Sequence, residues 1–262
     1  ALKTILEDRE ELVLLGFEEF QRAFNGIEAT IINSHSSIAE KITYRKLLRL
    51  LSVGKLCTHI RESRSSGTPR IEFFSGLFST VKFAEESYFQ SEDFFHPYVL
   101  SSLSINHKLS THAEKIMAKL SSSDNATFVH IRRGDHSIWP SIDAPAILPD
   151  SYYVKCIDII LSRYQNPFFV FMSDEYSYLQ HLFGGMENSY ISQGDSLEDF
   201  ALMSHCHNGI LSASSFSWWA AYFSSKKDEK SSFLAPKYWA GHSNSKWYPK
   251  FIKSQNLEYI EV

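Results

Sequence analysis

The sequence predicts an α/β fold whose C-terminal half contains a parallel β-sheet of the Rossmann type. From Thr127 onward, short apolar runs with strand character alternate with segments in which apolar residues recur at helical spacing. The connections between these segments are short, and strands that alternate with helices in this way pair in parallel. The Gly-x-Gly-x-x-Gly fingerprint of the dinucleotide-binding version of this fold does not occur in the sequence.

The first predicted strand, residues 127–131, is a run of β-branched and aromatic side chains. Pro149 then opens a predicted helix that continues through Tyr164. The apolar face of this helix is predicted to consist of Val154, Ile157, Ile160 and Leu161. The elements expected after it are a buried strand at 168–172, a weak strand at 190–191, a helix over 197–204 that stops near an αL cap at Asn208-Gly209, a strand at 210–213, a helix over 214–223 and a closing strand at 233–235.

The N-terminal half has weaker patterns. Residues 12–24 predict a helix, residues 27–32 a strand, and residues 37–51 an amphipathic helix with a basic polar side. A basic helix of this kind can lie on an anionic membrane surface, although it more commonly forms a solvated face. A capping box at 111–114 predicts the start of a further helix. The polar stretch 121–125 is the expected junction between an N-terminal domain, 1–122, and a C-terminal domain, 123–262.

The composition excludes some classes of function. A net charge of −4, from 26 basic and 30 acidic side chains, provides no electrostatic footprint for nucleic acid. The three cysteines, Cys57, Cys156 and Cys206, form no Cys-x-x-Cys pair, which favours a reducing compartment and hence the cytoplasm. No apolar run reaches the roughly 18 residues of a transmembrane helix, and no signal peptide opens the chain, which starts at Ala1 and leaves room for an upstream segment.

The strongest functional signal follows the first predicted strand. Phe128-Val129-His130-Ile131 leads directly into Arg132, Arg133, Gly134 and Asp135. Guanidinium groups are planar and permanently charged, and they match phosphate oxygens in a bidentate manner. Ligands of open α/β sheets also gather at the carboxyl ends of the strands. The segment therefore predicts a phosphate-binding site.

A second segment indicates the same chemistry. Ser214 and Ser215 fall between the predicted strand at 210–213 and the helix that follows it. Hydroxyl groups and free backbone N–H groups at a helix N-terminus form an anion site. In the simpler alternative the two serines only cap the helix. Together with the arginine pair on a neighbouring strand end, phosphate binding is the preferred interpretation.

Five segments occur together and in order. They are Ser87-Tyr88-Phe89-Gln90-Ser91-Glu92, His130-Ile131-Arg132-Arg133-Gly134-Asp135, Leu148-Pro149-x-x-Tyr152-Tyr153, Phe171-Met172-Ser173-Asp174, and Asp199 followed by Ser214-Ser215-Phe216-Ser217-Trp218-Trp219. Over about residues 80 to 250, this series resembles the α-1,2-fucosyltransferase family in its bacterial form.

The resemblance implies a GT-B-like architecture, in which two Rossmann-like domains face a cleft. It implies GDP-β-L-fucose as donor and inverting transfer of L-fucose to a glycan acceptor, at galactoside O-2, in an α-1,2 linkage. Neither a metal ion nor another cofactor is expected, and no nucleic-acid partner. Peripheral association with the inner face of a membrane, where glycan precursors are built, would fit such an activity.

The resemblance also implies roles for single residues. Arg132 would contact the β-phosphate with Arg133 beside it, and His130 would lie near the nucleotide. Asp199 would bind the guanine edge, and Ser215, next to Ser214, would donate to the β-phosphate. For catalysis, Arg132 would stabilise the leaving diphosphate. Asp135 would serve either as the base for the acceptor hydroxyl or as a salt-bridge partner that orients an arginine.

The sequence departs from the family in one respect, because no Gly-Gly-Leu-Gly-Asn-Gln-type loop occurs near its start. In the family this loop belongs to the acceptor-side domain, which would be 1–122 here, whereas 123–262 would bind GDP-fucose. The missing loop leaves two options, a sequence truncated at its start or a divergent member with impaired activity. A non-catalytic or impaired GDP-sugar-binding relative is the alternative function. Arg133-Gly134-Asp135 also spells an adhesion tripeptide, a frequent chance occurrence. His205-Cys206-His207 suggests zinc, but sequence neighbours point in divergent directions and no second ligand pair lies at finger spacing. Trp218-Trp219 could stack on a sugar, although at least one of the two is expected in the core.

Overall fold

The computed structural model describes most of the C-terminal half and parts of the N-terminal half. The described residues are 13–15, 20–25, 30–32, 42, 46, 56–62, 70–84, 103–120, 125–226 and 231–262. The chain divides into two compact units, 1–106 and 107–262, and each is described by itself.

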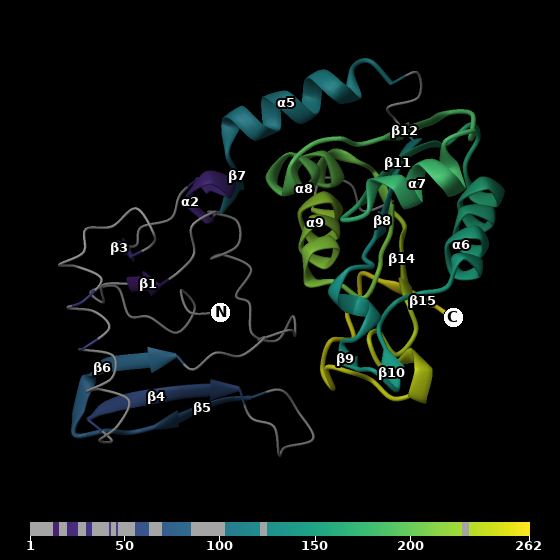
Figure 1. Ribbon diagram of the computed structural model, residues 1–262. Helices are drawn as coiled ribbons and strands as arrows, with labels where there is room; N and C mark the ends of the chain where they lie inside the picture. The colour runs from purple at the N-terminus through teal and green to yellow at the C-terminus, as the bar shows by residue number, and fades with distance from the viewer. Residues whose placement is uncertain are drawn as a thin grey trace. The chain divides into compact units, whose positions relative to one another are not determined.

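The C-terminal unit is built on a six-stranded parallel sheet (Figure 1). Its strands are β8 (Ala126–Ile131), β11 (Phe168–Ser173), β12 (Ser189–Ile191), β13 (Asn208–Ile210), β14 (Phe233–Pro236) and β15 (Glu258–Ile260). They lie in the order β12-β11-β8-β13-β14-β15, and every neighbouring pair is parallel. Counted along the chain this is the order 3-2-1-4-5-6 of Rossmann folds, which confirms the predicted α/β class and sheet type.

Helices cover both faces of this sheet (Figure 1). They are α6 (Asp150–Arg163) and α7 (Tyr176–Phe183) on one face, and α8 (Ser196–His205) and α9 (Ser215–Ser225) on the other. The helices change from one face to the other because the crossovers are right-handed and the direction of strand addition reverses. The chain first adds β11 and β12 on one side of β8, and then returns to the other side of β8 for β13. A doubly wound sheet of this kind has a crevice between β8 and β13, at the ends of the strands.

Helix α6 has a different buried face from the predicted one. Ile157 and Ile160 are buried as expected, but Val154 and Leu161 are 50% and 49% exposed. The face is centred instead on Tyr152 and Tyr153, both 1% exposed. The Tyr152 hydroxyl donates to the Leu211 carbonyl at 3.0 Å, so this aromatic side chain spans from the helix to the chain leaving β13. Burying two tyrosines outweighs burying the smaller aliphatic groups.

The predicted cap at Asn208-Gly209 is wrong. Helix α8 ends at His205, and both residues belong to strand β13. A Cβ atom at Gly209 would lie 2.3 Å from the Phe128 ring of the neighbouring strand, so the absence of a side chain is what lets this ring fill the core. The predicted series of strands also stops too early, since β15 follows β14 at the edge of the sheet.

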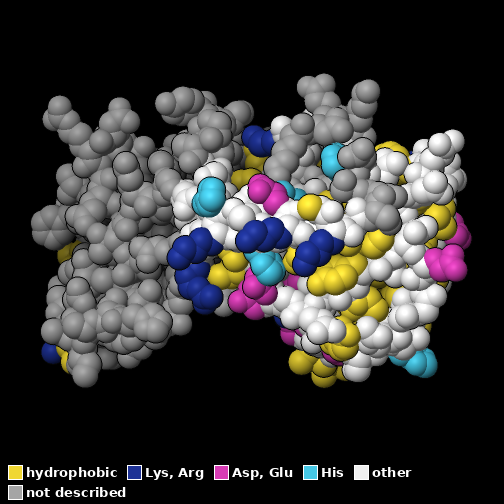
Figure 2. All heavy atoms as spheres, turned by 90° about the horizontal axis from the view of Figure 1, so that it is seen from above, with side chains coloured by type: hydrophobic (Ala, Val, Ile, Leu, Met, Phe, Trp, Pro, Cys, Tyr) yellow, Lys and Arg dark blue, Asp and Glu magenta, His cyan; other side chains and the backbone are white. Residues whose placement is uncertain are grey.

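The first helix of the C-terminal unit, α5 (His107–Met117), begins before the predicted capping box. Its inner face buries Ala113 and Met117, and Ser110 Oγ lies 3.0 Å from His205 Nε2 of α8. Figure 2 looks onto this helix and shows basic side chains along it. The exposed basic residues here are His107, Lys108, His112, Lys115 and Lys119. Because α5 packs on α8, it belongs to the compact unit 107–262. The predicted division into domains at 122 and 123 stays a prediction.

The described part of the N-terminal unit consists of short elements. They are β1 (Val13–Leu15), α2 (Phe20–Ala23), β2 (Phe24–Asn25), β3 (Thr30–Ile32), β4 (Cys57–Glu62), β5 (Ile71–Phe74), β6 (Phe78–Ala84) and β7 (Ser104–Ile105). β1 pairs with β3 in parallel, β2 pairs with β7 antiparallel, and β4 lies between antiparallel β5 and parallel β6. The helix predicted over 12–24 is therefore wrong at its start, whereas the strand predicted over 27–32 is confirmed for Thr30–Ile32.

Two sequence-based expectations remain predictions. The basic helix expected over 37–51 lies outside the described residues, except for positions 42 and 46. The facing of two Rossmann-like domains across a cleft also remains a prediction. Within the residues that the structure describes, no helix combines the length and the apolar character needed to cross a membrane.

Candidate active site

The predicted phosphate-binding residues follow two adjacent strands. β8 and β13 are hydrogen-bonded neighbours, with Val129 opposite Ile210. Arg132 follows the carboxyl end of β8, and Ser214 and Ser215 follow the carboxyl end of β13. The expectation that both segments occupy neighbouring strand ends is confirmed, and the place where they meet is the switch point of the sheet.

Arg132 is held between two carboxylates. Its Nε and Nη2 atoms each lie 2.8 Å from Asp135 Oδ1, and its Nη1 atom lies 3.1 Å from Asp174 Oδ2. The Nε contact is a hydrogen bond, and the other two contacts are ion pairs. The side chain is 37% exposed. Arg132 is thus both oriented and able to bind an incoming anion.

Asp135 makes the contact that its orienting role requires, and its role in the reaction stays a prediction. Its carboxylate is paired with Arg132 and is 61% exposed. Asp174, the residue after β11, supports the same loop, because its Oδ1 atom accepts the Arg133 backbone N–H at 3.0 Å. Gly134 gives this carboxylate room, since a Cβ atom there would lie 2.7 Å from Asp174 Oδ2.

Arg133 is engaged elsewhere, although it was predicted to bind the donor beside Arg132. Its Nε atom donates to Glu175 Oε2 at 3.0 Å, and its guanidinium lies 3.7 Å from the centre of the Tyr178 ring. The Tyr178 hydroxyl in turn donates to Asp150 at the start of α6. Successive side chains of an extended backbone point to opposite sides, which separates Arg133 from Arg132. Arg133 therefore ties the β8 loop to α7.

His130 is a buried, neutral residue of the site. It is 5% exposed, and its Nδ1 atom lies 2.8 Å from Ser212 Oγ, which joins β8 to the segment after β13 across the switch point. Burial lowers the pKa of His130 to about 3, and the positive charge of Arg132 acts in the same direction. The imidazole is therefore uncharged at neutral pH.

The two serines before α9 differ in function. The Ser214 hydroxyl accepts the Phe216 backbone N–H at 3.3 Å, so Ser214 is the N-cap of the helix, as in the simpler alternative. Ser215 is the first residue of α9 and is exposed. Its hydroxyl has no partner in the part of the chain that the structure describes. Ser215 can therefore donate to an anion at this helix end.

Asp199 lies on α8, which follows the edge strand β12. A series of aromatic contacts nevertheless connects the residue next to it with the switch point between β8 and β13. The neighbouring Phe200 ring lies 5.5 Å from the Phe216 ring, which lies 5.5 Å from the His130 ring. The Asp199 carboxylate accepts the Ser192 hydroxyl. Burial raises the pKa of Asp199 to about 6, with a smaller contribution from the nearby charges of Asp195 and Glu198.

Three supporting residues were not predicted as members of the site: Asp174, Ser192 and Ser212. Each directly follows a strand of the parallel sheet, or comes one residue later. Their place at the carboxyl edge is therefore the signal that could have identified them.

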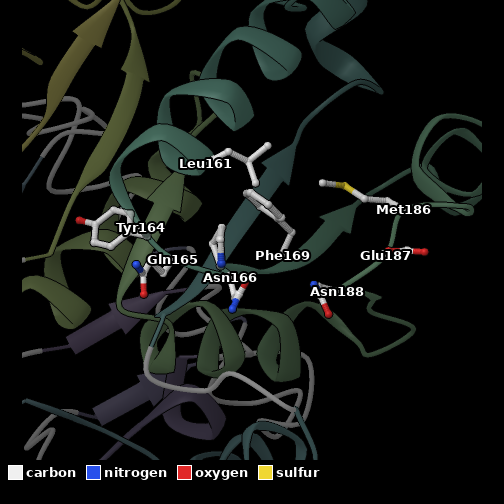
Figure 3. A pocket seen from close by; sticks show the side chains of 9 residues that line it. Leu161, Tyr164, Gln165, Asn166, Phe169, Met186, Glu187 and Asn188 are labelled. Atoms are coloured by element: carbon white, nitrogen blue, oxygen red, sulfur yellow. The ribbon is translucent and has the colours of Figure 1, made fainter.

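A separate groove of about 640 Å³ lies at the other end of the sheet (Figure 3). Its lining includes Tyr164 and Asn166 after α6, Phe169 at the start of β11, and Met186 and Asn188 before β12. It is therefore not the site of Arg132, which follows a carboxyl end. No three His, Cys, Asp or Glu side chains within the described ranges are grouped so that they could hold a metal ion.

Comparison with known proteins connects this geometry to a family. The chain is 32% identical over 128 residues to the O-antigen biosynthesis glycosyltransferase WbnK of Escherichia coli, which covers 47% of this chain and 42% of that protein. It is 26% identical over 142 residues to galactoside alpha-(1,2)-fucosyltransferase 2 of Rattus norvegicus, covering 49% and 40%. The matched region thus spans about two fifths of the length of these curated relatives.

Among solved structures, the chain resembles the fucosyltransferase NodZ from Bradyrhizobium with a TM-score of 0.41 and 13% identity, covering 78% of this chain and 75% of that one. A structure of POFUT1 in complex with GDP matches with a TM-score of 0.41 and 15% identity, covering 52% and 48%. The model of glycosyl transferase family 11 matches residues 71–259, which include both strand ends of the candidate site. The chain belongs to glycosyl transferase family 11.

Proposed function

We propose that this protein transfers L-fucose from GDP-β-L-fucose, with inversion, to a hydroxyl of a glycan acceptor, at galactoside O-2, forming an α-1,2 linkage. The observation that carries the proposal is the oriented guanidinium of Arg132 beside the α9 N-terminus, in a chain matched by the family model over 71–259. The relatives named as galactoside alpha-(1,2)-fucosyltransferases support the transferred sugar, the galactoside acceptor and the linkage.

The diphosphate of the donor would lie at the switch point. The guanidinium of Arg132, which is 37% exposed, would make a bidentate contact with the β-phosphate. The Ser215 hydroxyl and the first backbone N–H groups of α9 would complete this contact. As the bond between fucose C1 and the phosphate oxygen breaks, negative charge grows on the phosphate, and donors held in place there lower the barrier.

The guanine base would be bound by Asp199. A carboxylate accepts two parallel hydrogen bonds, which matches the N1–H and 2-amino donors of guanine and is mismatched to adenine and uracil. The Ser192 hydroxyl, which donates to Asp199, fixes the orientation of the carboxylate. Phe200 and Phe216 pack between Asp199 and His130, so the base site and the phosphate site share one rigid support.

Inversion requires the acceptor oxygen to attack C1 from the face opposite the phosphate. The new bond forms between this oxygen and C1 while GDP departs with the former bonding pair, and the proton of the acceptor hydroxyl passes to solvent water. Asp135 is paired with Arg132, so we assign it the orienting role. In a loose, oxocarbenium-like transition state the proton leaves late, which reduces the need for a strong base.

The charge that a metal ion would stabilise is assigned to Arg132 and the α9 N-terminus, so the proposed reaction is independent of metal. The alternative is a relative that binds a GDP-sugar without turning it over. Both hypotheses predict affinity for GDP, but only the enzyme predicts turnover of GDP-fucose.

The test begins with titration calorimetry of GDP, ADP and UDP into the chain in the presence of EDTA. Binding of GDP alone supports the donor site, and equal binding of the three nucleotides contradicts it. Incubation with GDP-fucose and lactose then separates the enzyme, which releases GDP and forms fucosyl-lactose, from the binding module, which forms neither.

A further inference from the structure

Two loops pack together next to Arg132. One follows β8 and contains η3 (Asp135–Ser137), β9 (Pro140–Ser141) and β10 (Ala144–Pro145), and the other follows β14 and contains η4 (His242–Asn244). The Ser243 hydroxyl donates to the Pro145 carbonyl at 3.3 Å, which joins them. Both loops leave carboxyl ends of the sheet, the edge at which ligands of this fold bind.

An aromatic pair lies where the loops meet. The Trp139 and Tyr248 rings, one from each loop, have centroids 5.8 Å apart at an angle of 56°. The His136 ring stacks on Trp139 with centroids 5.3 Å apart. Tyr248 is 42% exposed and Trp139 is half-buried, so both rings reach the surface.

The backbone beneath the pair is tightly held. The Trp139 N–H donates to the Asp135 carbonyl at 2.9 Å, and its carbonyl accepts the Ala146 N–H at 2.6 Å. Tyr248 forms a β-bridge with Trp239, which is only 1% exposed. Fixed aromatic rings bind a ligand at a low entropic cost, because little side-chain freedom remains to be lost.

The pair is contiguous with the arginine site through His136. His136 is 6% exposed and directly follows Asp135, the partner of Arg132. Burial lowers the pKa of His136, and the nearby charges of Asp135, Arg132 and Asp174 also act on it. Thus the chain leads from the partner of Arg132 directly to a buried ring that stacks on Trp139.

We propose that Trp139 and Tyr248 form a stacking platform for a pyranose ring of the glycan acceptor, beside the donor site. This inference rests on the proposed function, which it deepens by assigning part of the acceptor site to the C-terminal unit. The C–H face of a galactose ring is apolar and flat, and its rim carries hydroxyl groups. A tilted, exposed pair of an indole and a phenol matches this shape and polarity.

The surroundings fit a sugar bound at an open edge. Ile138 and Ile142, in the same loop as Trp139, are 62% and 79% exposed. The exposed Asp143 in the β9–β10 turn supplies a carboxylate in the same loop, a group that accepts hydrogen bonds from sugar hydroxyls.

Two substitutions of Trp139 test stacking itself. Trp139→Leu keeps an apolar side chain but removes the aromatic face, and Trp139→Phe keeps an aromatic face. We expect Trp139→Leu to raise the KM for lactose by about tenfold, the equivalent of ~1.4 kcal/mol, and Trp139→Phe to stay close to the wild type. The GDP affinity and the slow hydrolysis of GDP-fucose without acceptor should be unchanged in both. Trp247→Phe is the matched control, because Trp247 adjoins Tyr248 in sequence but packs on Tyr238 and Tyr259.

The results separate the platform from the donor site. An unchanged KM for lactose in Trp139→Leu overturns the platform, and so does an equal loss of GDP affinity, which would mean a structural role. If the chain does not turn over GDP-fucose, the proposed function fails, and saturation-transfer NMR of lactose with GDP present still tests the platform. Lactose signals that disappear in Trp139→Leu and persist in Trp139→Phe and Trp247→Phe support it. Lactose signals that are absent from the wild type, or that are the same in Trp139→Leu, overturn it.

Discussion

The affinity for GDP should depend on pH through Asp199. Burial raises the pKa of this carboxyl to about 6, so in the free protein it takes up a proton well above the usual range of an aspartic acid. The proposed guanine contact needs the ionised form, because a protonated carboxyl can accept only part of the pair of hydrogen bonds. At pH 7 most of the free protein is ready to bind, and at pH 5 only about one tenth is. The Kd for GDP should therefore rise about tenfold between pH 7 and pH 5.

Calorimetry in two buffers of different ionisation enthalpy measures the same linkage directly. Binding at pH 5 should release close to one proton, whereas binding at pH 7.5 should release almost none. His130 does not obscure this signal, because its pKa of about 3 keeps it neutral over the whole range. A Kd that does not change between pH 5 and pH 7 would refute the assignment of Asp199 to guanine.

Asp199→Asn is the matched variant. The amide cannot titrate, so the part of the proton release and of the pH dependence of the Kd that comes from this carboxyl should disappear, leaving the part that comes from the terminal phosphate of GDP. GDP should also bind more weakly at pH 7. The amide N–H can instead donate to a carbonyl. Xanthosine diphosphate carries an oxygen in place of the 2-amino group, so its affinity for the variant should rise relative to that of GDP. A variant that keeps the wild-type pH profile would show that another group titrates.

The same pKa shift has a consequence for stability. The Asp199 carboxyl binds a proton more readily in the folded state than in the unfolded state. The ionised carboxylate therefore lowers the free energy of unfolding above pH 6. This loss of stability is relieved as the pH falls through 6 toward the ordinary pKa of 3.8. Asp199→Asn should therefore be more stable than the wild type at pH 8, by on the order of 2 kcal/mol, and the two should converge near pH 4. Thermal melts at both pH values measure this difference.

Three further predictions concern other parts of the fold. Arg132→Lys keeps the charge but loses the two-pronged guanidinium, so kcat should fall by roughly a hundredfold or more. Arg133→Lys is the control and should stay closer to the wild type, because Arg133 is paired with Glu175. Near-wild-type turnover of Arg132→Lys would contradict the role of Arg132. EDTA should leave the turnover of GDP-fucose intact, and activity that is lost with the chelator and restored by a divalent cation would contradict the metal-independent mechanism. Gly209→Ala should lower the free energy of unfolding by about 1–3 kcal/mol, because the new Cβ would lie 2.3 Å from the buried Phe128 ring. Adding Phe128→Leu to this variant should recover part of the lost stability, as measured in a thermal melt.

The strands of the C-terminal unit and the two halves of its anion site were predictable from local patterns. The runs at 127–131 and 168–172 are long and apolar enough for a buried strand, and the polar residues after them mark the carboxyl edge. The prediction failed where tertiary contacts decide the structure. Gly209 is in a strand because of a ring on the neighbouring strand, and β15 has only three residues, too few for a period to be recognised.

The roles of the charged residues were predictable only in part. The adjacent Arg132 and Arg133 identified an anion site, but no local pattern shows which partner each of them has. Asp174 and Glu175 follow β11, about forty residues later, and they determine which guanidinium is left for a ligand. Polar contacts between strands that are distant in the sequence leave no local pattern.

The pairing of Arg132 with Asp135 and Asp174 means that this residue would contribute more to the rate of fucose transfer than to the affinity for the donor. One guanidinium paired with two carboxylates leaves a net charge of about −1, so it adds little to the attraction of a ground-state diphosphate, and the base contacts must hold the donor. When the sugar departs, the phosphate becomes the stronger competitor for the same N–H bonds, and the guanidinium can lean toward it. The site would then release GDP once the negative charge on its phosphate is reduced by protonation or by hydration. A guanidinium without carboxylate partners would bind the product more tightly and slow its release.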